Sequence, residues 1–375
     1  MLTQATASHP HPNPLPQKGE RTCIQRILEL ARWAPSGDNT QPWRFEIIDD
    51  HHLAVHAFDT RQTVVYDLQG RASQLAHGIL LETIRIAASA QGLGVAYARR
   101  GDAPEHTPIY DVRFHEDPSI ARDPLVDVIP SRTTQRRPMH PRALVPQEKR
   151  ALEQALPAAL GFAIRWIEGD ARRGVARLLF KSAHIRLTTE ECYRVHKHVI
   201  HWRNRYSDDR MPDQAIGLGT MTLRMMEWAM KSWGRVRTMN RLMGTAMPRL
   251  QLDYMPALKC GAHFLLLAER APQGIDDYVA AGAAVQRFWL TSAKLGLQFQ
   301  PEMTPLIFAN YVWNKVTFVQ DAKAQQTARA VAEGLAGLVG QETAQRAMFM
   351  GRLGHGAAPR ARSLRLPLEH LRKTD

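Results

Sequence analysis

APSGDNTQPWRF, residues 34–45, joins a segment with helical spacing to a segment with strand spacing. Apolar residues recur at helical intervals over 24–34, which predicts a helix that Pro35 should stop. The alternation over 44–48 predicts a strand. The stretch between them is therefore a loop rich in turn-forming residues and short polar side chains, and such a loop can direct N–H groups and an amide toward a ligand. The alternative is an ordinary turn that packs Trp43.

Length and composition favour a globular chain with more than one core. The 375 residues exceed a usual single-core domain, and 44% hydrophobic with 23% charged residues is ordinary for a folded protein. No run of about 18 apolar residues occurs, so we expect no transmembrane helix and no membrane partner. The three cysteines, Cys23, Cys192 and Cys260, lack CxxC spacing, which favours a reducing, cytoplasmic location over a disulfide scaffold.

The formal net charge of +13 favours anionic partners such as nucleic acid, anionic lipid or phosphate-bearing small molecules. The arginines are spread over many segments, without zinc-finger spacing or an aromatic RNA-binding signature. We therefore expect no nucleic-acid partner and attribute the charge to solubility and, at a few arginines, to phosphate ligands. Residues 1–20 contain several prolines and no apolar periodicity, which predicts a disordered tail.

Two stretches of the chain resemble each other, residues 76–95 and 280–299. Gly78 corresponds to Gly282, 204 positions later, and each stretch ends at a Gly-Leu pair. Each is predicted to be an apolar helix with a glycine C-cap. Strands are expected before both helices, at 53–59 and 262–270.

A second resemblance has a shorter offset. QRILELA at 25–31 corresponds to KRALEQA at 149–155, an offset of 124. The two offsets differ by 80, which predicts an insertion of about 80 residues in the second copy, at about 171–255. We therefore predict an α+β unit duplicated in one chain, with a helical insertion in its second half. The predicted organisation is a tail at 1–20, a first half at 21–130 and a second half at 131–375.

Three motifs resemble the nitroreductase family, whose members are flavin-dependent and fold as two-fold dimers. APSGDNTQPW resembles a loop of that family. SRTTQRRPMHPRALVPQEKRALEQA at 131–155 resembles the family's Arg-rich N-terminal start, and GRLGHGAAPRARSLRLPLEHL at 351–371 resembles its C-terminal end. The resemblance extends over about 21–371 and is weakest across 171–255. The loop is the most specific of the three motifs.

The motifs are divided between the two halves of the chain. The first half carries the loop, whereas the second carries the Arg-rich start and the closing arginine. The second half has only LPAALGFAIRW at 156–166 where its own loop should follow. The resemblance thus implies a nitroreductase-like fold duplicated as a monomeric pseudo-dimer, as in the fused, Acg-like branch, with one flavin site per chain.

The resemblance implies FMN as the cofactor and assigns residues to it. Planar arginines suit a phosphate of charge roughly −2, because two donors engage two oxygens together. The residues matched to phosphate, ribityl and ring-edge contacts are Arg132, Thr133, Thr134, Arg136, Arg362, Ser363 and Arg365. Those that line the flavin from the opposite half are Pro35, Ser36, Gly37 and Asn39, and those beside the N5 edge are Glu302, Met303 and Thr304. A solvated basic surface is the alternative for the arginines, and core packing for Met303.

The implied activity needs no nucleophile, general acid or metal ligand from the chain. By resemblance, NAD(P)H is the electron donor, and a nitroaromatic, a quinone or a related small molecule is the acceptor. No GxGxxG fingerprint follows a predicted strand, so we expect no separate Rossmann domain. A flavin-storing protein whose lid blocks substrates is one alternative, and a biosynthetic tailoring enzyme is another.

Two segments of the insertion remain open to more than one interpretation. HKHVIHW at 196–202 contains three histidines, for which a wet helix surface is favoured over a metal site. TMTLRMMEWAMKSW at 220–233 fits an amphipathic helix, for which core packing or cover for the pseudo-dimer is favoured over a lid on the flavin, with membrane contact as a third alternative.

Overall fold

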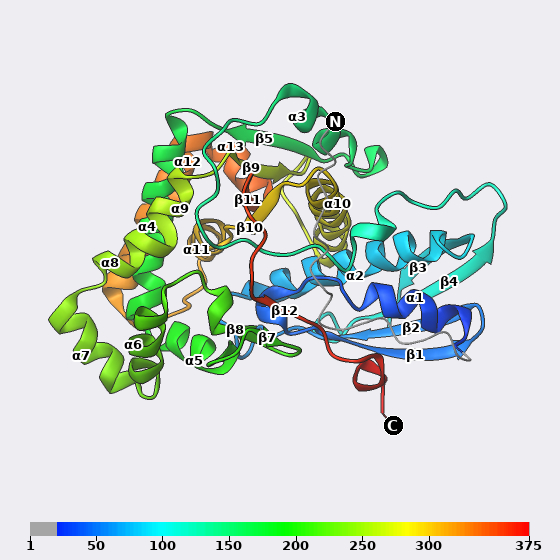
Figure 1. Cartoon of the computed structure of the whole chain (residues 1–375), viewed down its shortest axis with the longest axis horizontal. Coiled ribbons are helices and arrows are strands. Elements are labelled where there is room, and N and C mark those ends of the chain that lie inside the picture. The colour runs from blue at the N-terminus through cyan, green and yellow to red at the C-terminus, as the bar shows by residue number, and fades with distance from the viewer. Residues whose placement is uncertain (1–20, 375) are drawn as a thin grey trace, which may run out of the picture.

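The computed structural model describes residues 21–374 (Figure 1). The tail predicted at 1–20 lies outside the described residues. Among the helices described, none has both the length and the apolar character to cross a membrane.

The first half of the chain forms an antiparallel four-stranded sheet and two helices. Helix α1 begins after Thr22, whose hydroxyl accepts from the N–H of Gln25 while the Gln25 side chain accepts from the Thr22 N–H. The sheet order is β1-β2-β4-β3. The elements are α1 (Cys23–Ala31), β1 (Trp43–Asp49), β2 (His52–Ala57), α2 (Arg71–Ser89), β3 (Leu93–Arg99) and β4 (Ile109–Glu116).

The second half repeats this topology. Its sheet order is β10-β11-β9-β5, the same arrangement when β5, β9, β10 and β11 are matched in turn to the four strands of the first half. All pairs in both sheets are antiparallel. The duplicated α+β fold predicted from the sequence is confirmed. The matching elements are α3 (Pro146–Gln154), β5 (Ala163–Ile167), β9 (Ala262–Leu267), α10 (Ile275–Lys294), β10 (Gln298–Pro301) and β11 (Ala347–Gly354).

The two halves meet where α2 packs against α10, between the sheets (Figure 1). The helices cross at the two glycines that correspond in the repeat. A Cβ at Gly78 would lie 1.9 Å from the carbonyl oxygen of Val279, and one at Gly282 would lie 2.1 Å from that of Leu75. Only glycine permits so close an approach of two helical backbones. The buried amide of Gln286 donates to the Thr83 hydroxyl at 2.8 Å beside this crossing.

The predicted helical insertion joins β5 to β9 and occupies residues 168–261. The segment expected to form one helix at 220–233 is instead divided at Lys231 and Ser232, and Ser232 caps the second helix. The helices are α4 (Ala171–Thr188), α5 (Glu190–Val199), α6 (Thr220–Met230), α7 (Trp233–Met243), α8 (Ala246–Arg249) and α9 (Met255–Leu258). Three two-residue strands lie between α5 and α6: β6 (Ile200–His201), β7 (Tyr206–Ser207) and β8 (Met211–Pro212).

A second helical insertion, which the sequence repeat did not indicate, joins β10 to β11. It contains α11 (Thr304–Trp313), α12 (Ala322–Val339) and α13 (Gln341–Arg346), whereas the matching strands of the first half are joined by residues 100–108 alone. Helix α12 packs against α4. Together the two insertions cover the outer face of the second sheet, so every residue of β11 is buried. One face of β4 in the first sheet remains open to solvent.

The C-terminal segment, residues 355–374, returns from the second sheet to the first half (Figure 1). It contains β12 (Arg362–Ser363), which pairs in parallel with β7 of the insertion. Further along, the N–H of Leu366 donates to the Gln41 side chain at 2.9 Å. The C-terminal segment is therefore fastened to the 34–41 loop.

The glycine crossing gives a prediction about stability. Gly78→Ala and Gly282→Ala should each lower the free energy of unfolding by about 1–3 kcal/mol or more, because each new methyl group overlaps backbone atoms that cannot move independently. Gly337→Ala in α12 is the matched control. Its Cβ would meet nothing within 4 Å, so the change should stabilise the helix by up to about 1 kcal/mol.

Urea unfolding followed by circular dichroism measures all three variants. If the three shifted the unfolding midpoint in the same direction by similar amounts, the crossing would not be the tight contact described.

Candidate functional site

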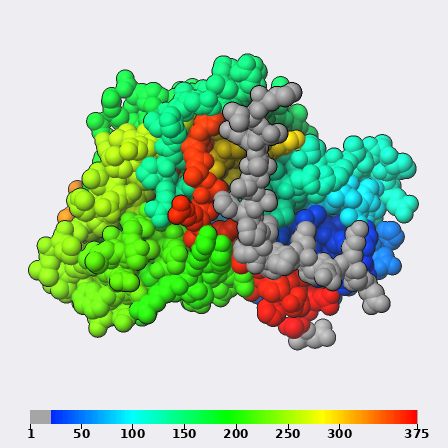
Figure 2. Space-filling view, viewed as in Figure 1, coloured from blue at the N-terminus to red at the C-terminus, as the bar shows by residue number. Residues whose placement is uncertain are grey.

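A cavity of about 500 Å³ lies where five parts of the chain meet: the 34–41 loop, the 131–137 segment, the first insertion, the junction of β10 with α11, and the C-terminal segment. In Figure 2 the red C-terminal segment lies against the blue-green segment that follows residue 130. The structure brings every sequence-predicted site residue to this central cavity. They are Pro35, Ser36, Gly37, Asn39, Arg132, Thr133, Thr134, Arg136, Glu302, Met303, Thr304, Arg362, Ser363 and Arg365.

The 34–41 loop has a strained backbone and is held by hydrogen bonds to the first insertion. Asp38, Asn39 and Gln41 have φ angles of 51°, 65° and 48°, in the left-handed region that non-glycine residues rarely occupy. The amides of Asn39 and Gln41 both donate to the carbonyl of Asp208 in the insertion, at 2.9 and 2.8 Å. The Ser36 hydroxyl closes the loop by accepting from the N–H of Gln41 at 2.9 Å. Asn39 therefore anchors the loop to the insertion through its side-chain amide.

Three arginines, two of them buried, gather at the lining of the cavity and are called the arginine cluster below. Arg132 and Arg365 are each only 4% exposed, and Arg362 is partly buried. The Arg365 Nε donates to the carbonyl of Ala34 at 2.8 Å, and an Arg362 Nη donates to that of Pro130 at 2.8 Å. Within residues 21–374, none of the three forms an ion pair with a carboxylate, and the Nε atoms of Arg132 and Arg362 have no hydrogen-bond partner.

Burial lowers the pKa of each of the three arginines of this cluster. Burial, followed by the charges of Arg365 and Arg362, holds the pKa of Arg132 well below its usual value. Burial, followed by the charges of Arg362 and Arg32, lowers the pKa of Arg365 to about 9, and burial lowers that of Arg362 to about 10. A bound anion would reverse each of these effects. Buried guanidiniums with unused donors are therefore suited to a phosphate, which offers several acceptor oxygens at once.

An aromatic pair, Trp289 and Phe299, packs against Arg132 of the arginine cluster. The guanidinium of Arg132 lies 4.4 Å from the ring centroid of Trp289, which stacks on Phe299 at 4.3 Å. The Trp289 indole donates to the carbonyl of Thr133 at 3.3 Å. Helix α10, which forms the interface between the halves, thus also fixes the position of the 131–137 segment.

Glu302, a predicted site residue, points its carboxylate into the protein. It contacts His263 Nδ1 at 2.6 Å and Arg352 Nη1 at 2.8 Å, and all three residues are buried. Arg352 also donates to the carbonyl of Arg136 at 3.0 Å. Glu302 therefore ties β9 and β11 to the cavity floor and to the 131–137 segment.

Glu302, His263 and Arg352 form a buried triad, and the charges within it set the pKa values of Glu302 and His263. Burial acts to lower the pKa of His263, but the charge of Glu302 and hydrogen bonds with Cys260 and Glu302 outweigh it and raise this pKa to about 10. Burial acts to raise the pKa of Glu302, but the charges of His263 and Arg352 outweigh it and lower this pKa. The triad thus carries a buried negative charge between two positive ones at neutral pH.

The neighbours of Glu302 contribute to the same junction. The Met303 sulfur accepts from the N–H of Met350 at 3.3 Å, and Met303 also packs against the core. The hydroxyl of Thr304, the first residue of α11, lies 3.3 Å from that of Ser182 in α4. These residues therefore hold the backbone of the β10–α11 junction at the cavity wall.

Several cavity residues escaped the sequence analysis. Arg186 pairs with Asp253 at 2.8 Å, joining α4 to the turn before α9. Burial raises the pKa of Asp38, although Arg136 and Arg186 oppose this effect. Arg352 could have been found, because it is a lone charge in an otherwise apolar strand. Within residues 21–374, no group of three His, Cys, Asp or Glu side chains is placed to hold a metal ion.

Methionines from the insertion form the apolar wall of the cavity. Met225, Met226 and Met230 of α6 line it, together with Met239 of α7. Trp228 of the same helix is 51% exposed and lies on the outer side of α6. The face of α6 that lines the cavity is therefore formed by methionines, and Trp228 belongs to a different surface.

No family model matches the chain. Over a stretch of 69 residues, 18% of its length, this chain is 38% identical to a Mycobacterium tuberculosis protein named "Putative NAD(P)H nitroreductase acg". The match is found in two strains. Part of the chain is similar to a nitroreductase. The match spans only 20% of the length of these relatives.

Two solved structures also match. A nitroreductase-like family protein from Bacillus cereus aligns over 68% of this chain and 96% of its own, with 12% identity and a TM-score of 0.36. The FMN-dependent nitroreductase NfnB from Mycobacterium smegmatis, in complex with NADPH, aligns over 65% and 95%, with 14% identity and a TM-score of 0.35.

The buried triad predicts a pH dependence of stability. Because folding raises the pKa of His263 from 6.5 to about 10, the folded protein binds this proton more tightly than the unfolded chain does. The resulting stabilisation is complete below pH 6.5 and is lost as the pH rises toward 10. Over that window the free energy of unfolding should therefore fall more steeply in the wild type than in His263→Gln.

Urea unfolding at intervals from pH 6 to pH 10 provides the measurement. The exposed His51→Gln is the control and should follow the wild type. Parallel pH profiles for the wild type and His263→Gln would contradict the assignment.

Proposed function

We propose that the central cavity binds one FMN and that the protein is an FMN-dependent NAD(P)H oxidoreductase of the nitroreductase type. The observation that carries the proposal is the arginine cluster: Arg132, Arg362 and Arg365 are gathered in a cavity without a carboxylate to pair with them among the described residues. A phosphate monoester would supply the missing charge. The name of the sequence relatives, an NAD(P)H nitroreductase, supports the same electron donor.

The remaining cavity residues fit the other parts of FMN. Thr133, Thr134 and Ser363 offer hydroxyls beside the arginine cluster, suited to a ribityl chain. The loop residues Pro35 to Asn39 and the apolar wall lie elsewhere on the lining, where a flat, largely apolar ring could be held. When bound, FMN accepts hydride from NAD(P)H and passes it to an acceptor. The chain's own contribution is to bind, orient and shield.

The methionines of the cavity wall affect which electron acceptors the cavity could hold. Unbranched thioether side chains adapt to ligands of different shape. Met225 is 38% exposed at the rim, whereas Met230 is buried. We therefore propose that nitroaromatics, quinones or related flat molecules are accepted, by a monomeric pseudo-dimer with one site per chain. In the first half of the chain, no segment matches the arginine-rich 131–137 segment.

A second candidate function is flavin storage. It is favoured by the coverage of the cavity, because α6 and α7 pack against α5 through Tyr193 and Met230 and so extend the core over the site. Anaerobic mixing of the flavin-loaded protein with NADPH or NADH separates the two functions. Rapid bleaching of the flavin absorbance supports the oxidoreductase, whereas a flavin that stays oxidised with both donors supports storage.

The stoichiometry of the proposed site can be measured directly. Acid-released FMN, quantified against protein by amino-acid analysis, should approach one per chain. A reproducible value near two would contradict the single-site proposal, and a protein that retains no flavin after reconstitution with FMN would contradict FMN binding itself.

The phosphate assignment predicts different losses for two flavins. Arg365→Met should weaken FMN binding by roughly tenfold to a hundredfold, because it removes charge-assisted hydrogen bonds worth about 1.5–3 kcal/mol. Riboflavin, which has no phosphate, should lose much less affinity. Arg372→Met, an exposed charge in the same segment, is the matched control and should bind both flavins as the wild type does.

Flavin fluorescence titration of the flavin-free protein gives the dissociation constants. Equal losses for FMN and riboflavin in Arg365→Met would assign the arginine a purely structural role.

A further inference from the structure

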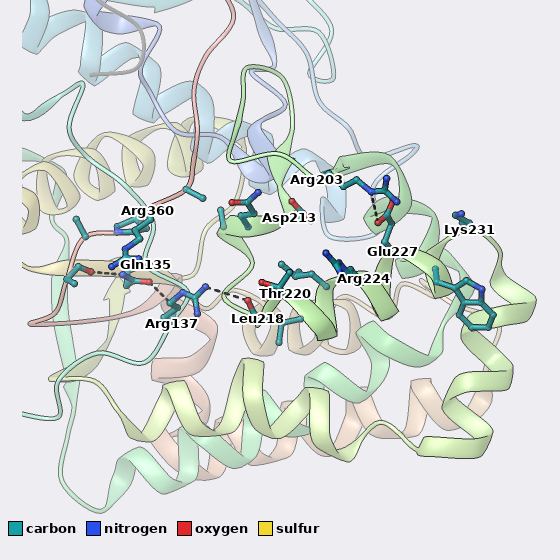
Figure 3. A pocket seen from close by; sticks show the side chains of 18 residues that line it. Gln135, Arg137, Arg203, Asp213, Leu218, Thr220, Arg224, Glu227, Lys231 and Arg360 are labelled. Carbon is teal, nitrogen blue, oxygen red and sulfur yellow. Dashed lines mark hydrogen bonds and ion pairs between the residues drawn. The ribbon is translucent and has the colours of Figure 1, made fainter. Parts of the chain in front are cut away.

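A second hollow, larger than the central cavity, lies on the outer side of α6 (Figure 3). Its volume is about 1170 Å³, and its lining comes from the 135–137 segment, the first insertion and the C-terminal segment. Leu218 and Ala361 line both this hollow and the central cavity. The two spaces therefore adjoin at these two side chains.

The charges that line this hollow are strongly unbalanced. Five cationic side chains face two carboxylates, those of Asp213 and Glu227. Glu227 pairs with Arg203 at 3.1 Å, and the buried Asp213 accepts from the backbone N–H of Asn204 at 3.1 Å. The cationic residues are Arg137, Arg203, Arg224, Lys231 and Arg360. We call this space the basic hollow.

One of these cations is held in place without an acidic partner among the described residues. The Arg137 guanidinium donates to the carbonyl of Gly217 at 3.2 Å and to that of Leu218 at 3.5 Å. Its backbone N–H donates to the side chain of Gln135, which is buried and in turn donates to the carbonyl of Ala357 at 2.7 Å. Figure 3 shows this chain of contacts on one side of the basic hollow and the Arg203–Glu227 pair on the other. A guanidinium that is already held in place loses little conformational entropy when it binds an anion.

An aromatic surface completes the basic hollow. Trp228 lines it with half of its surface exposed, and Arg235 lies 5.0 Å from its ring centroid. Leu223 is buried on the same lining. Unpaired cations beside an exposed aromatic ring suit a ligand that combines several phosphate charges with a flat base.

We propose that the basic hollow binds the phosphorylated adenosine end of the electron donor and makes the protein selective for NADPH over NADH. This inference rests on the proposed oxidoreductase function. The two donors differ by the 2′-phosphate of NADPH, which adds about two negative charges at neutral pH. Because the lining has a surplus of three positive charges, the more highly charged donor is bound more strongly. The pyrophosphate bridge of the donor allows its two ends to occupy the adjacent spaces.

Binding of a donor fragment tests the basic hollow separately from the redox reaction. Isothermal titration calorimetry with the full-length, flavin-loaded protein should show that 2′,5′-ADP binds at least tenfold more tightly than 5′-AMP or inorganic pyrophosphate. Arg224→Ala combined with Lys231→Ala should weaken 2′,5′-ADP binding by roughly tenfold or more. Arg237→Ala on α7 removes one exposed charge outside the lining and is the control. Raising the salt concentration should reduce the preference.

Steady-state kinetics provide the second readout. The ratio of kcat/KM for NADPH to that for NADH should fall about tenfold in the double variant and stay unchanged in Arg237→Ala. Equal affinities for 2′,5′-ADP and 5′-AMP, or an equal loss in the control, would overturn the assignment of the basic hollow. A protein that is reduced by NADH and NADPH with equal efficiency would overturn the selectivity alone, and one that holds no flavin would overturn the proposed function instead.

Discussion

The close crossing of α2 and α10 is the constraint on which the rest of the structure depends. Because Gly78 and Gly282 carry no side chain, two long helices approach until their backbones touch, and each then carries its own sheet on the opposite side. This geometry also places the end of α10 near the 131–137 segment, where Trp289 supports Arg132. The interface between the halves and the floor of the central cavity are therefore built from the same helix. A substitution that disrupts the helix crossing is expected to displace the cavity floor as well.

Duplication followed by divergence explains why the two halves are unequal. In the first sheet, one face of β4 is open to solvent, and much of β3 and β4 alternates between more buried and more exposed residues. In the second sheet, the central strands β9 and β11 are buried almost throughout and almost uniformly apolar, which is the pattern that burial on both faces requires. The lone charges in those strands, His263 and Arg352, are accordingly paired through Glu302. Insertions supplied the extra cover and, with it, the methionine wall of the cavity.

Local patterns predicted the repeated elements well because a helix and a strand leave their period in the sequence. The loop 34–41 and the arginines were identified by resemblance, and all of them lie at one cavity. The insertion at 302–346 was missed because the detected repeat ended before it. The pairing of Arg186 with Asp253, and the outward position of Trp228, could not be predicted because they depend on how helices of the insertion rotate against one another. Periodicity identifies an apolar face but does not say which neighbour it meets.

The return of the C-terminal segment has a consequence for synthesis of the protein. Arg362, Arg365 and Leu366 are translated after every strand of the two sheets, yet they complete the arginine cluster and fasten the 34–41 loop. While these residues are still within the ribosome, both sheets can already fold outside it. The arginine cluster can therefore be completed only after all strands of both sheets have been made. A chain that stopped between Gly354 and Arg362 would contain both sheets and still lack two of the three arginines of the cluster.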